Sequence, residues 1–184
     1  MYFKPMNRIC RRICLGAVLA VPAAVVALAG SPLALADGAL DYQKLEGAIT
    51  DTLNDQYAQI SREVSDVECP RSETPPKTGD TITCNAVVDG QTVRVAAEVQ
   101  DDDYNVHFAT LDTLFDLERT AEGLDPAITD QVGFPVTVTC GTGLKVVAIG
   151  DSFECTAADS DGDSRTVKVT AGPVGEDDTW EVIE

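Results

Sequence analysis

Apolar residues recur at helical intervals near the start of the chain. They follow one another every three or four positions from residue 45 to residue 64, which places them on one face of a helix. The residues of this stripe are Leu45, Ile49, Leu53, Tyr57, Ile60 and Val64. The spacing therefore predicts an amphipathic helix across this segment.

A second stretch with helical spacing begins after residue 110. Its first residues are Leu111, Leu114, Phe115 and Glu118. The pattern is then interrupted at Gly123 and at Asp125-Pro126. Because Asp125 suits an N-cap and Pro126 the first position of a helix, we expect a second short helix that continues through Val132.

Segments that alternate apolar and polar residues follow both helical stretches. Alternation with a period of two is typical of strands with one buried face. The segments are 82–84, 93–95 and 104–108 in the first half and 136–140, 167–169 and 179–184 in the second. Each half thus predicts a helix packed on an antiparallel sheet of about four strands, an α+β fold of two tandem small domains.

The two halves repeat each other in sequence. Residues 79–84 read GDTITC and residues 150–155 read GDSFEC, so glycine, aspartate, a hydroxyl residue, a large apolar residue, a polar residue and cysteine match in order. We assign the first repeat to residues 37–110 and the second to residues 111–184. The linker around residues 107–112 has no run of Pro, Gly or Ser, so we expect the two domains to sit close together.

The first 36 residues have the pattern of a secretory signal peptide. Four basic residues and no acidic residue precede or flank an apolar stretch over 15–29, and small residues at 34 and 36 indicate cleavage after Ala36. The apolar stretch is short and contains Pro22, which is unfavourable for a membrane span. We therefore expect a secreted or cell-envelope protein that contacts a membrane only if its N-terminal segment stays uncleaved as an anchor.

Charge narrows the range of partners. The chain has a formal charge of −18, and all 31 acidic residues but only nine of the 13 basic residues lie beyond residue 36, which leaves −22 for the exported part. A surface this acidic repels phosphate backbones and anionic lipid head groups. We therefore expect no nucleic-acid partner, whereas an unidentified envelope or extracellular protein or ligand remains open.

Four cysteines lie beyond the leader: Cys69, Cys84, Cys140 and Cys155. Four thiols in an exported chain predict two disulfides, for which three pairings are possible. The interval from the first cysteine to the second equals the interval from the third to the fourth, at 15 residues. This equality favours one internal disulfide in each domain, Cys69–Cys84 and Cys140–Cys155.

The order of these motifs resembles an actinobacterial exported domain of unknown function, family 4333 of that series. Cys69-Pro70 and the GDTITC motif carry the resemblance in the first half, and residues 138–140 with the GDSFEC motif carry it in the second. The second half departs from the pattern because Gly141 replaces proline after its first cysteine. The resemblance implies tandem copies in an envelope or secreted setting, and it brings no activity and no catalytic residues.

The segment Gly150-Asp151-Ser152 is similar to the nucleophile block of SGNH-type esterases. A catalytic serine needs a histidine as its base. The chain has one histidine, His107, and it precedes the serine. The other repeat carries Gly79-Asp80-Thr81 in the same place, which favours a turn in both halves over a catalytic site.

His107 lies in an alternating strand, where we expect it to face solvent. A zinc site would lack ligands, because no second histidine exists and the cysteines beyond the leader are expected in disulfides. We therefore expect no catalytic residue, no cofactor and no enzyme activity.

Alternate aspartates in the segment 159–164, DSDGDS, form a weak calcium candidate. Carboxylate oxygens suit calcium, but the glycine and the final glutamate of an EF-hand loop are missing from their positions. The candidate ligands are Asp159, Asp161 and Asp163. A plain hairpin turn rich in Asp, Gly and Ser is the alternative.

Two acidic turns at corresponding places in the repeats are a candidate surface for a basic partner. They comprise Asp101, Asp102 and Asp103 in the first half and Glu176, Asp177 and Asp178 in the second. The segment 70–78, PRSETPPKT, lies inside the first disulfide and predicts an exposed, stiff loop.

These patterns favour a non-enzymatic binding module whose ligand is unknown. An alternative is a protein inhibitor of a secreted enzyme, since secreted inhibitors of β-lactamase also repeat a small disulfide-bearing helix-and-sheet unit. A hydrolase is the weakest of the three hypotheses.

Overall fold

The computed structural model describes residues 11–12, 40–173 and 177–183. The leader expected over residues 1–36 therefore lies outside the described residues, apart from the two-residue strand β1 (Arg11–Arg12). The elements of the first half are α1 (Tyr42–Tyr57), η1 (Ala58–Ile60), β2 (Val64–Glu68), β3 (Thr81–Val88), β4 (Gln91–Val99) and β5 (Val106–Thr110). Those of the second are β6 (Asp112–Asp116), α2 (Leu117–Val132), β7 (Val136–Thr139), β8 (Leu144–Ala148), β9 (Ser152–Asp159), β10 (Ser164–Thr170) and β11 (Thr179–Ile183).

Helix α1 follows the expected stripe as far as Tyr57. It begins after the N-cap Asp41, whose carboxylate accepts a hydrogen bond from the Lys44 N–H at 3.1 Å. Its buried side chains are Leu45, Ile49, Leu53 and Tyr57. After η1, Ser61 adopts a left-handed conformation with φ of 56°, and the chain turns into β2. The helical expectation for Val64 is therefore wrong, because this residue is the first of a strand.

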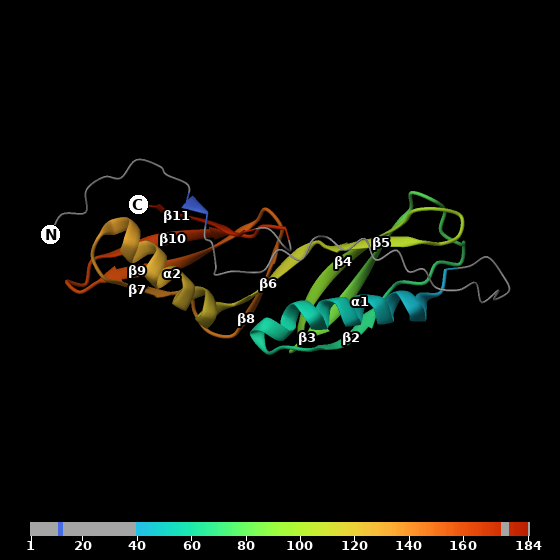
Figure 1. Ribbon diagram of the computed structural model, residues 1–184, viewed down its shortest axis with the longest axis horizontal. Coiled ribbons are helices and arrows are strands. Elements are labelled where there is room, and N and C mark those ends of the chain that lie inside the picture. The colour runs from blue at the N-terminus through green and yellow to red at the C-terminus, as the bar shows by residue number, and fades with distance from the viewer. Residues whose placement is uncertain (1–10, 13–39, 174–176, 184) are drawn as a thin grey trace.

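The two main sheets have corresponding strand orders. The first sheet is antiparallel in the order β2-β3-β4-β5, and the second runs β7-β9-β10-β11 with β1 beyond β11. One helix lies against each sheet, and the halves follow one another along the long axis of the molecule (Figure 1). The expected α+β fold of two small domains, each with a helix, an antiparallel sheet and a disulfide, is confirmed.

Helix α2 ends at Val132 as expected, but its start and its continuity differ from the expectation. Residues 112–116 form β6 rather than the start of a helix. The helix begins after the N-cap Asp116 and continues past Pro126 to Val132 without a break. The strand conformation has a packing reason, since Leu114 and Phe115 lie on opposite faces of β6 and join different hydrophobic cores. A helix would have separated these neighbouring side chains by only about 100° around its axis, too little for them to point to opposite faces.

Strands β6 and β8 form a two-stranded ribbon between the halves. Leu114 of β6 belongs to the first core, and Val146 and Leu144 of β8 pack against that core. Phe115 and Val147 belong to the second core. The ribbon therefore contributes to both cores, although all of its residues lie beyond residue 110. No helix within the described residues has the length and apolar character needed to cross a membrane.

Candidate interaction site

Both disulfides form as the spacing predicts, Cys69–Cys84 and Cys140–Cys155. In each half, the residue that follows the first strand of the sheet is joined to the neighbouring strand, β3 or β9. The two disulfides thus close segments of equal length at corresponding places. What the chain does between the cysteines differs between the halves.

In the first half the segment is an irregular loop, residues 70–80, which we name the clamped loop. Its beginning is held against α1, because the Arg71 guanidinium lies 5.6 Å from the centre of the Tyr42 ring and 3.6 Å from the Glu46 carboxylate. Glu46 also accepts a hydrogen bond from the Cys69 N–H at 3.1 Å. All residues of the loop are exposed except Pro76, which is half-buried.

The end of the clamped loop is held by a turn against β4. The Lys77 N–H donates to the Asp80 carboxylate at 2.8 Å, and the Gly79 N–H donates to the Val99 carbonyl at 2.8 Å. Gly79 has a φ of 89°, which a residue with a Cβ adopts only with strain. The loop is therefore exposed along its length but fixed at both ends.

The clamped loop lies beside the β4–β5 turn, residues 100–105. The Thr78 hydroxyl donates to the Asp102 carboxylate at 2.9 Å. Asp101 shapes the turn itself, because its carboxylate accepts hydrogen bonds from the side chain of Asn105 at 2.7 Å and from the Asp103 N–H at 3.1 Å. These bonds, led by the one from the Asn105 side chain, lower the pKa of Asp101. We name the clamped loop and this turn together the outer end of the first half (Figure 1).

In the second half, the segment between the cysteines contains a paired strand instead of an exposed loop. It forms β8, which pairs with β6 over the whole ribbon. Glu118, in the first turn of α2, accepts a hydrogen bond from the Gly143 N–H at 2.9 Å. The same interval between cysteines therefore builds the junction in one half and an exposed loop in the other.

The two Gly-Asp motifs form the same turn. The Gly79 N–H donates to the Val99 carbonyl and the Val99 N–H to the Asp80 carbonyl. The Gly150 N–H donates to the Ala171 carbonyl and the Ala171 N–H to the Asp151 carbonyl in the same manner. Both glycines have a φ of 89°. The turn expected from the repeat is thus present in both halves.

The acidic turns lie at different places in the molecule. The first belongs to the outer end, whereas the second follows β10 next to the ribbon, where the Thr113 hydroxyl donates to the Gly172 carbonyl at 2.9 Å. Asp178 accepts a hydrogen bond from the Gly172 N–H at 2.9 Å, and burial raises the pKa of its carboxyl group. Glu176 lies outside the described residues. The described residues of the two turns, 101–103 and 177–178, therefore lie at separate places in the fold.

Other candidate residues from the sequence are also separate. His107 is exposed on β5, opposite Glu98 of β4. In the β9–β10 hairpin, the Asp159 carboxylate accepts hydrogen bonds from the N–H groups of Asp161 at 2.9 Å and Asp163 at 3.0 Å. Across the described part of the chain, no group of three or more His, Cys, Asp or Glu residues is placed to hold a metal ion.

The hairpin geometry predicts a result for Asp159→Ala. Loss of the acceptor for two backbone N–H groups is expected to lower the free energy of unfolding by about 1 kcal/mol. In thermal melts, the melting temperature of the variant should fall by the same amount with and without about 1 mM calcium. This concentration is near the Kd of weak extracellular calcium sites. Ser160→Ala in the same turn is the control. A calcium-induced rise in melting temperature that Asp159→Ala abolishes would instead support the calcium site.

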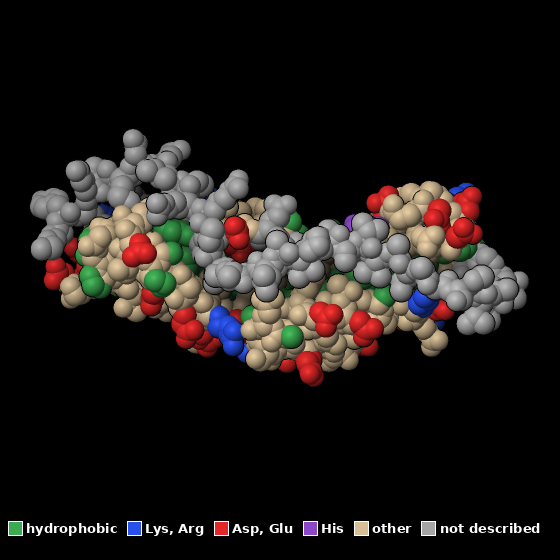
Figure 2. All heavy atoms as spheres, viewed as in Figure 1, with side chains coloured by type: hydrophobic (Ala, Val, Ile, Leu, Met, Phe, Trp, Pro, Cys, Tyr) green, Lys and Arg blue, Asp and Glu red, His purple; other side chains and the backbone are tan. Residues whose placement is uncertain are grey.

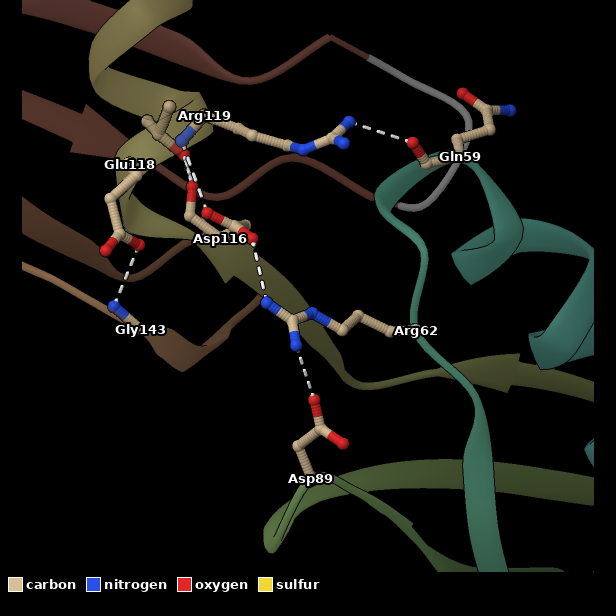
Figure 3. Close-up of polar contacts among 8 residues, drawn as sticks. Gln59, Arg62, Asp89, Asp116, Glu118, Arg119 and Gly143 are labelled. Carbon is tan, nitrogen blue, oxygen red and sulfur yellow. Dashed lines mark hydrogen bonds and ion pairs between the residues drawn. The ribbon is translucent and has the colours of Figure 1, made fainter.

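A polar network connects the two halves beside the ribbon (Figure 3). The Arg62 guanidinium lies between two carboxylates, at 2.8 Å from Asp89 in the β3–β4 turn and 3.3 Å from Asp116 at the start of α2. Arg119 extends in the other direction and donates to the Gln59 carbonyl at 2.9 Å. Asp116 also caps α2, and the hydrogen bond from the Arg119 N–H is the largest cause of its lowered pKa.

A second, more buried ion pair lies at the start of the ribbon. Asp112 is only 3% exposed, and its carboxylate accepts hydrogen bonds from the Arg94 backbone N–H at 2.8 Å and from Arg94 Nε at 2.9 Å. A further bond from the Arg94 guanidinium completes a bidentate pair. These bonds lower the pKa of Asp112. Burial, and to a smaller extent the negative charge of Asp112, raises the pKa of Tyr57 to about 12.

No local sequence pattern indicates this junction as a whole. Arg62, Arg94 and their partners come from segments far apart in the chain, so no local pattern brings them together. One signal was present, since Asp116 directly precedes an apolar residue and is followed by residues with good helix propensity, as an N-cap should be. On the surface shown in Figure 2, acidic side chains are spread over both halves, and basic and acidic side chains meet near the junction.

The N-cap gives a direct test of the junction. Asp116→Ala is expected to lower the free energy of unfolding by about 1 kcal/mol, because the first turn of α2 loses its side-chain acceptor. Asp116→Asn retains an acceptor and should lose clearly less. Urea denaturation of both variants measures the difference. Equal losses would show that the ion pair with Arg62, rather than the cap, is the main contribution.

The first half of the chain is similar to a known family without an assigned function, in that one family model matches it. The model of a domain of unknown function, DUF4333, matches residues 23–103. The resemblance expected from the sequence is therefore confirmed over the first half of the chain, and the match does not include the second half. No curated protein and no solved structure matches the chain.

Proposed function

We propose that this protein is a secreted or cell-envelope interaction module without enzymatic activity, and that the outer end of the first half binds its partner. The observation that carries the proposal is the clamped loop. It is exposed along nearly its whole length, yet a disulfide, an ion pair and a turn hold both of its ends. Exposed loops on a rigid scaffold are where proteins most often bind.

The junction supports this role because it makes the scaffold a single unit. The ribbon shares residues with both cores, and Arg62 is held by carboxylates from both halves. The second half then provides a fixed base for the outer end instead of a separate swinging domain. Such preorganisation lowers the entropic cost of binding.

Local contacts at Ser152 favour this proposal over a hydrolase. The Ser152 hydroxyl lies 2.9 Å from the hydroxyl of Thr170, the residue opposite it on the neighbouring strand β10. Its preceding Gly-Asp pair forms the same turn as the pair at residues 79–80. His107 lies on β5 of the first half, so these contacts offer the serine no imidazole base.

The two disulfides fit an extracellular protein, because such bonds persist in oxidising compartments. Export through the leader and cleavage after Ala36 remain predictions. N-terminal sequencing of the protein recovered from culture medium and from envelope fractions tests them. A first residue at position 37 is the expected result.

Photo-crosslinking tests the site of binding. The full chain carries p-benzoylphenylalanine in place of Glu73, an exposed residue of the clamped loop, and the producing cells are irradiated. Glu154→p-benzoylphenylalanine, an exposed position on the second sheet, is the matched control. The proposal expects one dominant adduct from position 73 that is missing at position 154. No adduct at position 73, or the same adducts at both positions, contradicts it.

An enzyme inhibitor is distinguished at the next step. If the adduct contains a secreted enzyme, the purified protein is added to that enzyme and its rate is measured. A stoichiometric loss of rate identifies inhibition as the role of the outer end. Panels of ester and glycoside substrates, incubated with the protein alone, should show no turnover.

A further inference from the structure

The middle of the clamped loop contains two consecutive prolines, Pro75 and Pro76. The proline ring holds its own φ near about −65°. A proline also excludes the residue before it from the helical region, and both Thr74 and Pro75 precede a proline. Covalent geometry therefore favours the extended polyproline II conformation at Pro75 and Pro76, directly after a bend at residues 73–74.

These residues present unused binding groups to solvent. Thr74 and the ring of Pro75 are exposed, and Pro76 is half-buried, so Pro75 offers the larger part of the contact surface. Within the described residues, no hydrogen bond is made to the carbonyl oxygens of residues 74–76. Carbonyl groups are strong acceptors, and a polyproline II segment leaves them directed outwards for a partner.

The segment is ordered before it meets a partner. On one side, Arg71 is held by Tyr42 and Glu46. On the other, Thr78 is bonded to Asp102 and the turn at Gly79 is bonded to β4. The chain therefore loses little further freedom when these residues are bound, which is the condition for useful affinity from a short segment.

The second half offers no equivalent. Residues 141–154 contain no proline, and β8 within them is paired along the ribbon. The repeat thus uses the same interval for internal pairing in one half and for presentation in the other. Only the first half displays a polyproline II segment at this place.

We infer that residues 74–76 are the docking element of the outer end, and that they bind a partner protein through a groove lined by aromatic side chains. This inference rests on the proposed function and specifies the partner. Aromatic rings stack on the proline rings, and Trp N–H or Tyr O–H groups donate to the free carbonyls of the segment. The acidic turn at residues 101–103 lies beside the clamped loop, so it borders the proposed contact surface, but it does not itself enter the partner's groove.

The test introduces Pro75→Ala with Pro76→Ala into the full chain that carries the crosslinker at position 73. Pro135→Ala, which alters an exposed proline before β7 in the other half, is the matched control. Thermal melts first establish that both variants fold. We expect the yield of the adduct to fall at least about tenfold in the double variant, equivalent to about 1.4 kcal/mol of binding, and to stay unchanged in the control. The crosslinked peptide of the partner should contain at least two Trp or Tyr residues.

The outcomes separate the two proposals. An undiminished adduct in the double variant, or a partner peptide without aromatic residues, overturns the inference about the groove and leaves the interaction module in place. An equal loss in Pro135→Ala also overturns it, because the effect would then not belong to this segment. A chain that forms no adduct from position 73 overturns the proposed function and the inference together.

Discussion

Replacing both Cys69 and Cys84 by alanine is expected to lower the free energy of unfolding by about 3 kcal/mol. The two cysteines are 15 positions apart. In the chain-entropy model, a crosslink over this interval lowers the conformational entropy of the unfolded chain and so stabilises the folded state by about 3 kcal/mol. Small domains are only marginally stable, so the double variant should have a clearly lower melting temperature than the wild type. Urea denaturation followed by circular dichroism measures the loss.

Cys140→Ala with Cys155→Ala is the matched experiment, because it opens a segment of the same length. The chain-entropy model expects a similar loss. A clearly larger loss would show that β8 and the ribbon depend on this disulfide to stay paired. A loss below about 1 kcal/mol in both double variants would contradict the expectation that the disulfides are a main source of stability.

Asp112→Asn is expected to lower the free energy of unfolding by about 2 kcal/mol at pH 7. It breaks a bidentate ion pair in which the carboxylate is buried, although the Arg94 side chain is 49% exposed. The folded state holds the pKa of Asp112 below its usual value, and the first cause is the hydrogen bond from the Arg94 side chain. A carboxyl group with a lowered pKa contributes stability above its unfolded pKa, about 3.9, and loses that contribution as the pH falls through the folded pKa.

The difference between wild type and Asp112→Asn should therefore be full at pH 7 and shrink below about pH 4. Urea denaturation across this pH range measures it. Asp89→Asn is the control, because its carboxylate is half exposed in its ion pair and such pairs contribute little. Asparagine also tolerates the positive φ of 47° at this position. A difference that stays constant with pH would show that packing, rather than charge, accounts for the loss.

The two helices show how far local patterns reach. The stripe from Leu45 to Tyr57 predicts α1 because its residues face a single core. The helix predicted from the stripe after Leu111 is wrong for residues 112–116, because Leu114 and Phe115 pack into two different cores on either side of β6. Asp125 resembles an N-cap in sequence, but in the structure its carboxylate accepts a hydrogen bond from the Val138 N–H at 2.6 Å and joins α2 to β7. A short polar side chain before a proline has the same local appearance in both roles.

The sequence by itself determined the class of fold, the pairing of the cysteines and the turns at the Gly-Asp motifs, because each depends on spacing within one half or on its repetition in the other. Only the tertiary structure decided that the second inter-cysteine segment pairs into the ribbon, and where the acidic turns lie. Pairing of β8 with β6, and the contacts of Arg62 and Arg94 with carboxylates more than 15 positions away, depend on how the halves pack. The Pro-rich sequence of residues 70–78 already predicted an exposed loop, and the structure confirms it. Use of the corresponding segment of the second half in the ribbon depends instead on contacts between the halves.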